Sequence, residues 1–176
     1  KRQPLLFETK KEAPMPVHPF APVYDGNSRV LILGSFPSVK SRETQFYYGH
    51  PQNRFWKVTA NLFGCDVPVT VQEKREMLLQ NRVAVWDTLA SCDITGSSDA
   101  TIRNPVANDI SRIIEEADIR LVCFNGKKSA DIFEKYSPVE CKLPSATLPS
   151  TSPANAQYSL ERLLLSWRKI LSPYLF

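Results

Sequence analysis

The chain has 176 residues, 43% of them hydrophobic and three of them tryptophan, which is enough apolar material for one folded domain with its own core. Its 22 Lys and Arg outnumber its 18 Asp and Glu, and the net charge of +4 is compatible with a nucleic-acid partner without requiring one. The four cysteines form no CxxC pair, and no apolar stretch approaches the roughly 18 residues of a membrane span, so we expect neither a metal site nor a membrane protein.

Residues 1–19 are predicted to form a flexible, basic and proline-rich tail. They contain four of the 14 prolines and four Lys or Arg, without any hydrophobic period. Such a tail is more typical of a solubilising leader than of a clamp for a polyanion. Residues 20–176 are predicted to form a single domain, entered through a turn at residues 25–28.

The rest of the chain is expected to be organised around residues 30–56, VLILGSFPSVKSRETQFYYGHPQNRFW. The apolar run at its start predicts a buried strand, and Gly34 and Pro37 force a turn directly after it. A polar loop at residues 40–45 leads to three consecutive aromatic residues, to His50 and to Asn53, which is placed to cap a helix. A glycine, aromatic rings, an imidazole and a carboxamide so close together indicate a pocket for a flat ring.

The alternation of strands and helices along the chain predicts right-handed βαβ units. Strands are expected at residues 30–33, 83–86, 119–124 and 141–147, the last as an edge strand because it contains Pro144. Helices are expected at residues 53–63, 70–80, 108–117, 127–136 and 160–171. Residues 91–102 and 148–155 are predicted to be exposed polar loops. The predicted fold class is α/β, with three α-β-α layers and a central, mostly parallel sheet of about four strands.

In a parallel sheet the carboxyl ends of the strands meet at one edge, and open α/β folds bind their ligands there. Lys127 and Lys128 follow Gly126 at the start of a predicted helix, an arrangement that favours phosphate, although surface lysines are more often solvated. Four loops are expected at this edge, and three of them are rich in Gly, Ser, Thr, Pro or Asn, residues whose exposed N–H and O–H groups can bind phosphate. These loops are residues 34–38, 87–98, 125–128 and 148–155.

Four blocks of the sequence resemble the uracil-DNA glycosylase superfamily: GSFPS after the first strand, YYGHPQNRFW, VWD ending the second strand and LPSTSPAN before the last helix. The order and spacing of these blocks extend the resemblance over nearly all of residues 29–171. GHPQNRFW followed by a helix is the most specific block, and the pattern is most similar to the hypoxanthine (deoxyinosine) DNA glycosylase branch. The resemblance implies a uracil-DNA glycosylase-like fold.

The resemblance also implies catalytic roles. The backbone N–H groups of Gly34 and Ser35 would hold a carbonyl oxygen of the base and stabilise the departing anion, as an oxyanion hole does. Most of the superfamily has an Asp or Asn next in this motif to orient the attacking water. This chain has Phe36 there, which shifts the role to Asn53; an amide takes no proton at neutral pH, so Asn53 would align the water.

Base recognition is implied in the same way. Tyr48 would stack on the flipped base, Asp87 would recognise the edge of the base, and Leu148 replaces a histidine found in many relatives. Phe36 is expected to line the base pocket with Gly34 and Ser35. Further contacts with the loops or the DNA are expected from Ser38, His50, Asn125, Lys127, Lys128, Ser150, Thr151, Ser152 and Pro153.

We therefore expect a monofunctional DNA glycosylase that flips a deaminated base out of the helix and hydrolyses its N-glycosidic bond in base excision repair. Hypoxanthine from deoxyinosine is expected first and uracil second. No lysine is placed to form a Schiff base, and no metal or other cofactor is expected. The expected partner is double- or single-stranded DNA with a deaminated base. No signal peptide is visible, so we expect an intracellular protein, cytoplasmic or in the nucleoid if the source is a bacterium, with a nuclear location left open. We also expect a monomer.

Three other functions remain open at this point. One is a mismatch-specific uracil/thymine glycosylase, and another is a module that binds damaged DNA without chemistry. The third is a hydrolase with Ser35, His50 and Asp87 as nucleophile, base and orienting acid, although the serine lies in no GxSxG turn. Structural roles compete as well: Asn53 as a helix cap, Tyr48 as packing under a loop, and His50 as a loop organiser.

Overall fold

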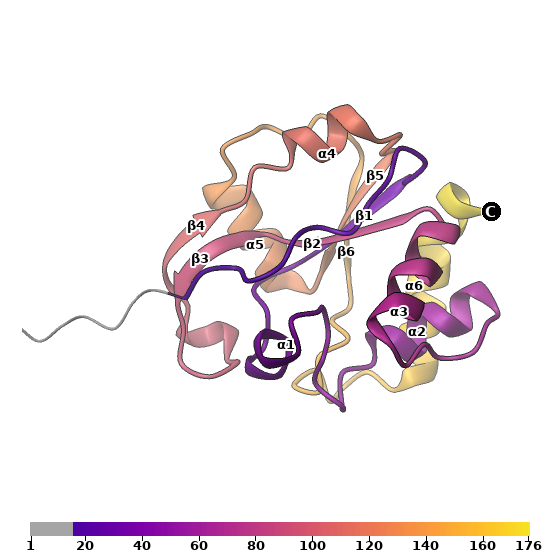
Figure 1. The fold of residues 1–176 in the computed structure, drawn as a ribbon, viewed down its shortest axis with the longest axis horizontal. Helices are drawn as coiled ribbons and strands as arrows, with labels where there is room; N and C mark the ends of the chain where they lie inside the picture. The colour runs from indigo at the N-terminus through magenta and orange to yellow at the C-terminus, as the bar shows by residue number, and fades with distance from the viewer. Residues whose placement is uncertain (1–15) are drawn as a thin grey trace, which may run out of the picture.

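The computed structural model describes residues 16–176, and the predicted residues 1–15 of the tail lie outside this range (Figure 1). Its centre is a four-stranded sheet in the order β2-β1-β5-β6, in which every neighbouring pair is parallel. The strands are β1 (Val30–Gly34), β2 (Val83–Asp87), β5 (Leu121–Asn125) and β6 (Ser145–Leu148). The predicted α/β class with its central parallel sheet is confirmed, and β6 is the edge strand that Pro144 predicted.

The sheet is covered on both faces, which explains why its strands are continuous apolar runs. Successive β1 residues point to opposite sides: Ile32 belongs to one hydrophobic cluster, and Leu31 and Leu33 to the other. The first cluster packs beneath α2 (Phe55–Phe63), α3 (Val71–Gln80) and α6 (Leu160–Leu175), which Figure 1 shows grouped together. The second packs beneath α4 (Ser111–Glu116) and α5 (Lys127–Tyr136). These are the three predicted layers.

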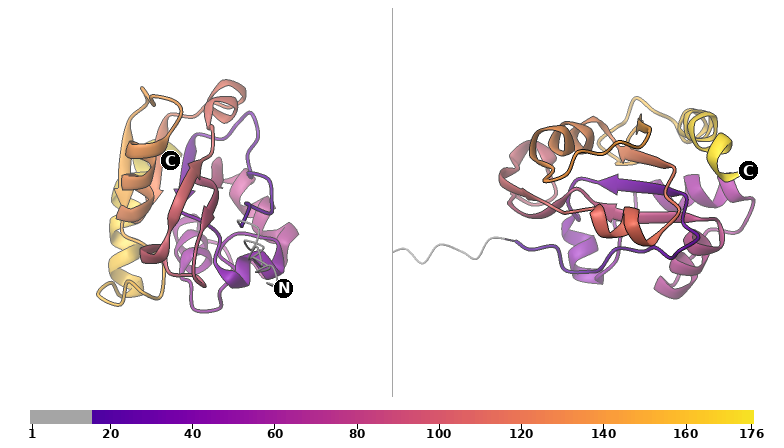
Figure 2. Two further views of the ribbon diagram at one scale, coloured as in Figure 1. Left: turned by 90° about the vertical axis from the view of Figure 1, so that its left-hand side faces the viewer. Right: turned by 90° about the horizontal axis from the view of Figure 1, so that it is seen from above.

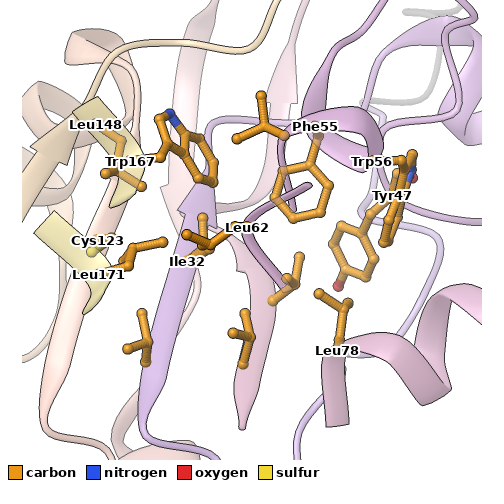
Figure 3. Packing of buried hydrophobic residues seen from close by; sticks show 14 of the residues in the cluster. Ile32, Tyr47, Phe55, Trp56, Leu62, Leu78, Cys123, Leu148, Trp167 and Leu171 are labelled. Carbon is orange, nitrogen blue, oxygen red and sulfur yellow. The ribbon is translucent and has the colours of Figure 1, made fainter. Parts of the chain in front are cut away.

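The aromatic core beneath α2 and α6 supports the edge of the sheet where the strands end. Trp167 is fully buried, and its ring lies 5.9 Å from that of Phe55, edge to face (Figure 3). The Trp167 indole N–H donates to the carbonyl of Pro149 at 3.0 Å, so the core also fixes the start of the loop after β6. Burial of these rings contributes on the order of a few kcal/mol to the stability of the domain.

Helix ends follow the local sequence signals. Thr70 caps α3 in a capping box with Glu73, and Gly64 ends α2 in the left-handed conformation at φ 69°. The predicted helix at 108–117 begins later, at Ser111, because Asn108 is drawn into contacts with β2: its side chain donates to the carbonyl of Asp87 at 2.9 Å. The last helix extends beyond its predicted end at residue 171, to Leu175.

Two predicted loops contain regular structure. The polar segment at 40–45 forms a short helix, α1 (Val39–Thr44), whose start is capped by the Ser38 hydroxyl. Residues 91–102, predicted to be an exposed loop, contain the end of β3 (Leu89–Asp93), an exposed connection at residues 95–98 and a 3-10 turn at Asp99–Thr101. They lead into β4 (Arg103–Ala107), which pairs antiparallel with β3 (Figure 2). The prediction failed because Cys92 and Ile102 are buried in a small cluster with Phe36, a long-range contact that no local pattern reveals.

The described part of the predicted tail, residues 16–19, packs onto the domain. Val17 forms an antiparallel bridge with Ser91 of β3, and Val23 forms another with Val85 of β2. The backbone N–H of His18 donates to the carbonyl of Ala90 at 2.7 Å. The domain therefore begins before residue 20. None of the helices in residues 16–176 is both long and apolar enough to cross a lipid bilayer.

Candidate active site

A cavity of about 310 Å³ lies where β1, β2 and β5 end, the position at which open parallel sheets bind ligands. Its volume is at the lower end of the range for small-molecule sites, about 300–1,000 Å³, and suits a flat heterocycle. The loops predicted to meet at this edge do meet. Residues lining the cavity include Gly34, Ser35, Phe36, Ser38, Tyr48, His50, Asn53, Asp87, Asp99, Asn125, Ser150, Thr151, Ser152 and Pro153.

The floor of the cavity depends on the absence of a side chain at Gly34. A Cβ atom there would overlap Asp87 Oδ1 and lie 3.2 Å from the Tyr48 hydroxyl oxygen. A carboxylate oxygen and a phenol therefore converge on the end of β1. The β1 end is held from below by Ser129 of α5, whose hydroxyl oxygen lies 2.9 Å from the carbonyl oxygen of Leu33 and 3.0 Å from that of Gly34.

Asp87 is 4% exposed, and its second oxygen, Oδ2, accepts a hydrogen bond from His18 Nε2 at 2.7 Å. The sequence placed His18 in the tail, 69 residues away from Asp87 in the chain, so no local signal pointed to this contact. A buried carboxylate needs such a partner because an unpaired charge in a dry site is costly.

Tyr48 has the left-handed backbone conformation, φ 51°, and its ring stacks on Phe55 with centroids 4.0 Å apart. Burial raises the pKa of its phenol, so Tyr48 stays protonated at physiological pH. Among residues 16–176 the buried hydroxyl has no hydrogen-bond partner. A buried, unpaired O–H beside Asp87 is a donor available to a ligand.

Asn53 contributes to the helix start and lines the cavity as well. Its Oδ1 accepts the backbone N–H of Phe55 at 2.9 Å, which fixes the carboxamide at the beginning of α2. His50 Nδ1 accepts the backbone N–H of Gln52 at 3.1 Å, so the neutral ring carries its proton on Nε2. Asn53 is not the N-cap that the sequence offered as an alternative, because the N-cap of α2 is Arg54 and Asn53 precedes it. His50 does make the contact of a loop organiser, and both side chains also line the cavity.

A second carboxyl group enters the cavity from the 3-10 turn between β3 and β4. The Ser35 hydroxyl donates to Asp99 Oδ1 at 2.8 Å. Burial raises the pKa of Asp99, the charge of Asp87 raises it further, and the Ser35 hydrogen bond opposes both. No sequence pattern singled out Asp99, because the surrounding polar residues are typical of an exposed loop.

The sequence predicted that the loop after β6 is exposed, but the structure shows that hydrogen bonds anchor it to the rest of the domain. Thr151 is fully buried, and its hydroxyl and backbone N–H pair with the Asn125 carboxamide at 3.0 and 3.1 Å. The guanidinium of Arg54, which the sequence analysis assigned no role, donates to the carbonyls of Ser152 at 2.9 Å and Asn155 at 3.0 Å, and also to that of Tyr158. One side chain thus shapes the wall of the cavity.

The hydrolase triad is not assembled in the described residues. Ser35 pairs with Asp99, Asp87 pairs with His18, and His50 pairs with a backbone N–H, so none of the hydrogen bonds that a triad requires is present. Lys127 and Lys128 do not line the cavity. Lys127 is exposed and bonds Asp131 at 2.7 Å. Within residues 16–176 no group of three or more His, Cys, Asp or Glu is placed to hold a metal ion.

Comparison with known proteins identifies the class. The model of the uracil DNA glycosylase superfamily matches residues 21–171, and the chain belongs to this superfamily, which confirms the resemblance found in the sequence. A solution NMR structure of a candidate uracil DNA glycosylase from Methanosarcina acetivorans has a TM-score of 0.72 and 32% sequence identity, and the match covers 88% of this chain and 96% of that one.

Two more specific similarities lie within the superfamily. The chain is 37% identical over 147 residues to a hypoxanthine DNA glycosylase from Methanosarcina acetivorans, a match that covers 81% of this chain and 90% of the relative. It is 36% identical over 122 residues to a hypoxanthine DNA glycosylase from Methanosarcina barkeri, covering 68% of this chain and 75% of the relative.

Asp99 is expected to reduce stability at neutral pH. Its pKa is raised in the folded state, so the folded protein binds this proton more tightly than the unfolded chain, and stability falls as pH rises above the ordinary value of 3.8. Asp99→Asn, which keeps an acceptor for Ser35, should raise Tm at pH 7 by about 2–4 °C. The gain should shrink when the melts are repeated near pH 4. The exposed Asp66→Asn is the matched control, and an unchanged or lower Tm for Asp99→Asn at pH 7 would contradict the expectation.

Arg54→Met is expected to loosen residues 150–158 while the sheet stays intact, because it removes charge-assisted hydrogen bonds, each of which contributes about 1.5–3 kcal/mol. Hydrogen–deuterium exchange should become at least about tenfold faster in this segment and stay unchanged in β1 and β5. Arg168→Met, at an exposed position of α6, is the control. Equal exchange in the two variants would show that Arg54 does not hold the loop.

Proposed function

We propose that this protein is a monofunctional DNA glycosylase that removes hypoxanthine from deoxyinosine in DNA, with uracil as a weaker substrate. The observation that carries the proposal is the convergence of Asp87 Oδ1 and the Tyr48 hydroxyl on Gly34 inside the cavity. Membership of the superfamily and similarity to two proteins named hypoxanthine DNA glycosylase support it. We propose that the enzyme acts as an intracellular monomer on double- and single-stranded DNA.

The polar groups of the cavity suit the edge of hypoxanthine. This base has an acceptor, the 6-oxo group, next to a donor, N1–H. The Tyr48 hydroxyl and the backbone N–H of Ser35 would donate to the oxo group, and Asp87 Oδ1 would accept from N1–H. Adenine has the reverse pattern, with an amino donor at position 6 and an unprotonated N1. Its amino group would face the donors of Tyr48 and Ser35, and its N1 would face the Asp87 carboxylate. Sites that pair polar groups in this way reject a mismatched pattern by up to about 10⁴.

The remaining residues suggest how the bond is broken. A glycosylase must flip the nucleotide out of the stack, which costs on the order of a few kcal/mol. In our proposal the departing base anion is stabilised by backbone N–H groups of Gly34 and Ser35 and by the His50 Nε2 proton. Asn53, held in one orientation by Phe55, aligns the attacking water.

Phe36 is no candidate for the water-aligning role, because it is a hydrocarbon side chain packed in the cluster with Leu89 and Cys92. None of the lysines in residues 16–176 lines the cavity, which favours direct hydrolysis over a Schiff-base lyase. We propose that Ser38 and the loop of Ser150, Thr151, Ser152 and Pro153 contact the DNA strand near the flipped nucleotide. Lys127 and Lys128 would contribute to phosphate binding from the surface.

A nicking assay tests the proposal on duplexes containing inosine, uracil, xanthine, mismatched thymine or adenine. We expect cleavage after alkali with inosine preferred. Asn53→Ala should lower the single-turnover rate on inosine by at least about a hundredfold, the scale of losing one polar catalytic group, while the affinity for the duplex is retained. A near-wild-type rate would transfer the water-aligning role to His50, and binding of damaged duplex without release of any base would favour the non-catalytic module.

Asp87→Ala should weaken the preference for inosine over adenine more than it weakens duplex binding, because it removes the acceptor for N1–H. The two quantities are measured as the ratio of single-turnover rates and as the dissociation constant of an inosine duplex. Exposed Asp66→Ala serves as the control for lost negative charge. An unchanged ratio in Asp87→Ala would exclude Asp87 from base recognition.

A further inference from the structure

The segment before β1 reaches the active site from outside the central sheet. Pro16, Val17 and His18 run antiparallel to β3: Val17 bridges Ser91, and the backbone N–H of Cys92 donates to the carbonyl of Pro16 at 3.3 Å. Further along, the segment bridges β2 at Val23. The strand-like contacts fix the backbone at both ends of residues 16–23, so a side chain between them is held in a defined position.

The side chain held there is His18. Its ring lies 4.7 Å from the ring of Phe20, 5.9 Å from that of Tyr47 and 6.1 Å from that of Phe36, so aromatic rings surround it. The Tyr47 hydroxyl donates to the carbonyl of Ala21 at 3.0 Å and fastens the same segment. The imidazole therefore has little freedom to rotate away from Asp87.

The hydrogen bond between the two residues is short and buried: Nε2 lies 2.7 Å from Asp87 Oδ2, and each side chain is 5% exposed. The backbone N–H of Phe20 lies 3.5 Å from Nδ1 and favours a proton on Nε2. With Oδ2 occupied, only Oδ1 of Asp87 remains for a ligand, and this atom is the one that crowds Gly34 at the floor of the cavity.

We propose that His18 is a positioning residue that holds Asp87 as a single-oxygen acceptor and thereby sets the discrimination of hypoxanthine from adenine. This inference rests on the proposed function, because it assigns His18 to the recognition step of that activity. The reason is geometric: a carboxylate that is fixed at one oxygen presents the other in one direction, and a misplacement of about 1 Å at a reacting site costs about 10²-fold in rate.

The test compares two substitutions of His18. His18→Phe fills the aromatic surroundings without a donor, and His18→Gln places an amide N–H near the position of Nε2. We expect His18→Phe to lower the single-turnover rate on inosine duplex by about 10–100-fold and to reduce the inosine-to-adenine ratio. His18→Gln should restore both to within about threefold of wild type. Val17→Ser, in the same segment with a side chain 68% exposed, should leave both unchanged.

A double-mutant cycle separates positioning from general loss of stability. In an Asp87→Asn background, His18→Phe should change the rate by less than about threefold, because its partner is already altered. If His18→Phe alone does not fold, His18→Asn, whose amide lies too far back to reach Oδ2, takes its place with the same expectations.

The outcomes are distinct. Three results would overturn the positioning role and leave the glycosylase proposal standing. They are a wild-type single-turnover rate in His18→Phe, equal losses of rate in His18→Phe and His18→Gln, and additive losses of rate in the double-mutant cycle. A wild-type protein that releases none of the tested bases would overturn both.

Discussion

The candidate active site depends on a close approach at the end of β1, where Gly34 has no side chain. Because the space of a Cβ atom is occupied by Asp87 Oδ1 and bordered by the Tyr48 hydroxyl, an acceptor and a donor come together on the backbone itself. The parallel sheet makes this approach possible, since Gly34 pairs directly with Asp87 in the register of β1 and β2. A flat base edge requires this spacing of polar groups on one small surface.

The residues around the end of β1 hold the polar groups of the cavity in fixed positions. Ser129 holds the end of β1, His18 holds one oxygen of Asp87, and Phe55 covers one face of the Tyr48 ring. Arg54 and Asn125 hold the loop that forms the opposite wall. Such preorganisation is what electrostatic catalysis needs, because groups that are already oriented do not have to reorganise during the reaction. This arrangement lowers the stability of the folded protein at neutral pH. Burial and the nearby charge of Asp87 raise the pKa of Asp99, so its ionised form is less stable in the folded state than in the unfolded chain.

The fold was largely predictable from the sequence because its strongest signals are local. Strands buried on both faces are continuous apolar runs, and helices such as α3 and α5 begin and end close to where their caps and hydrophobic periods predicted. The β3–β4 pair was missed because its strands are short and partly exposed, and their burial depends on Phe36 and Ile132 from distant segments. Of the residues in and around the cavity, those within recognisable motifs were predicted from the sequence. His18 and Asp99 were not, since each acquires its role only through a contact with a residue far away in the chain.

We propose that this cavity receives a deaminated purine and releases it by hydrolysis, without a metal. The most direct measurement is chromatographic quantification of the free base after incubation of the protein with an inosine-containing duplex in the presence of a chelator. We expect free hypoxanthine to accumulate in an amount equal to that of the abasic sites, while the DNA backbone remains intact until alkali is added. Strand cleavage without free hypoxanthine, or no release at enzyme concentrations that saturate the duplex, would contradict it.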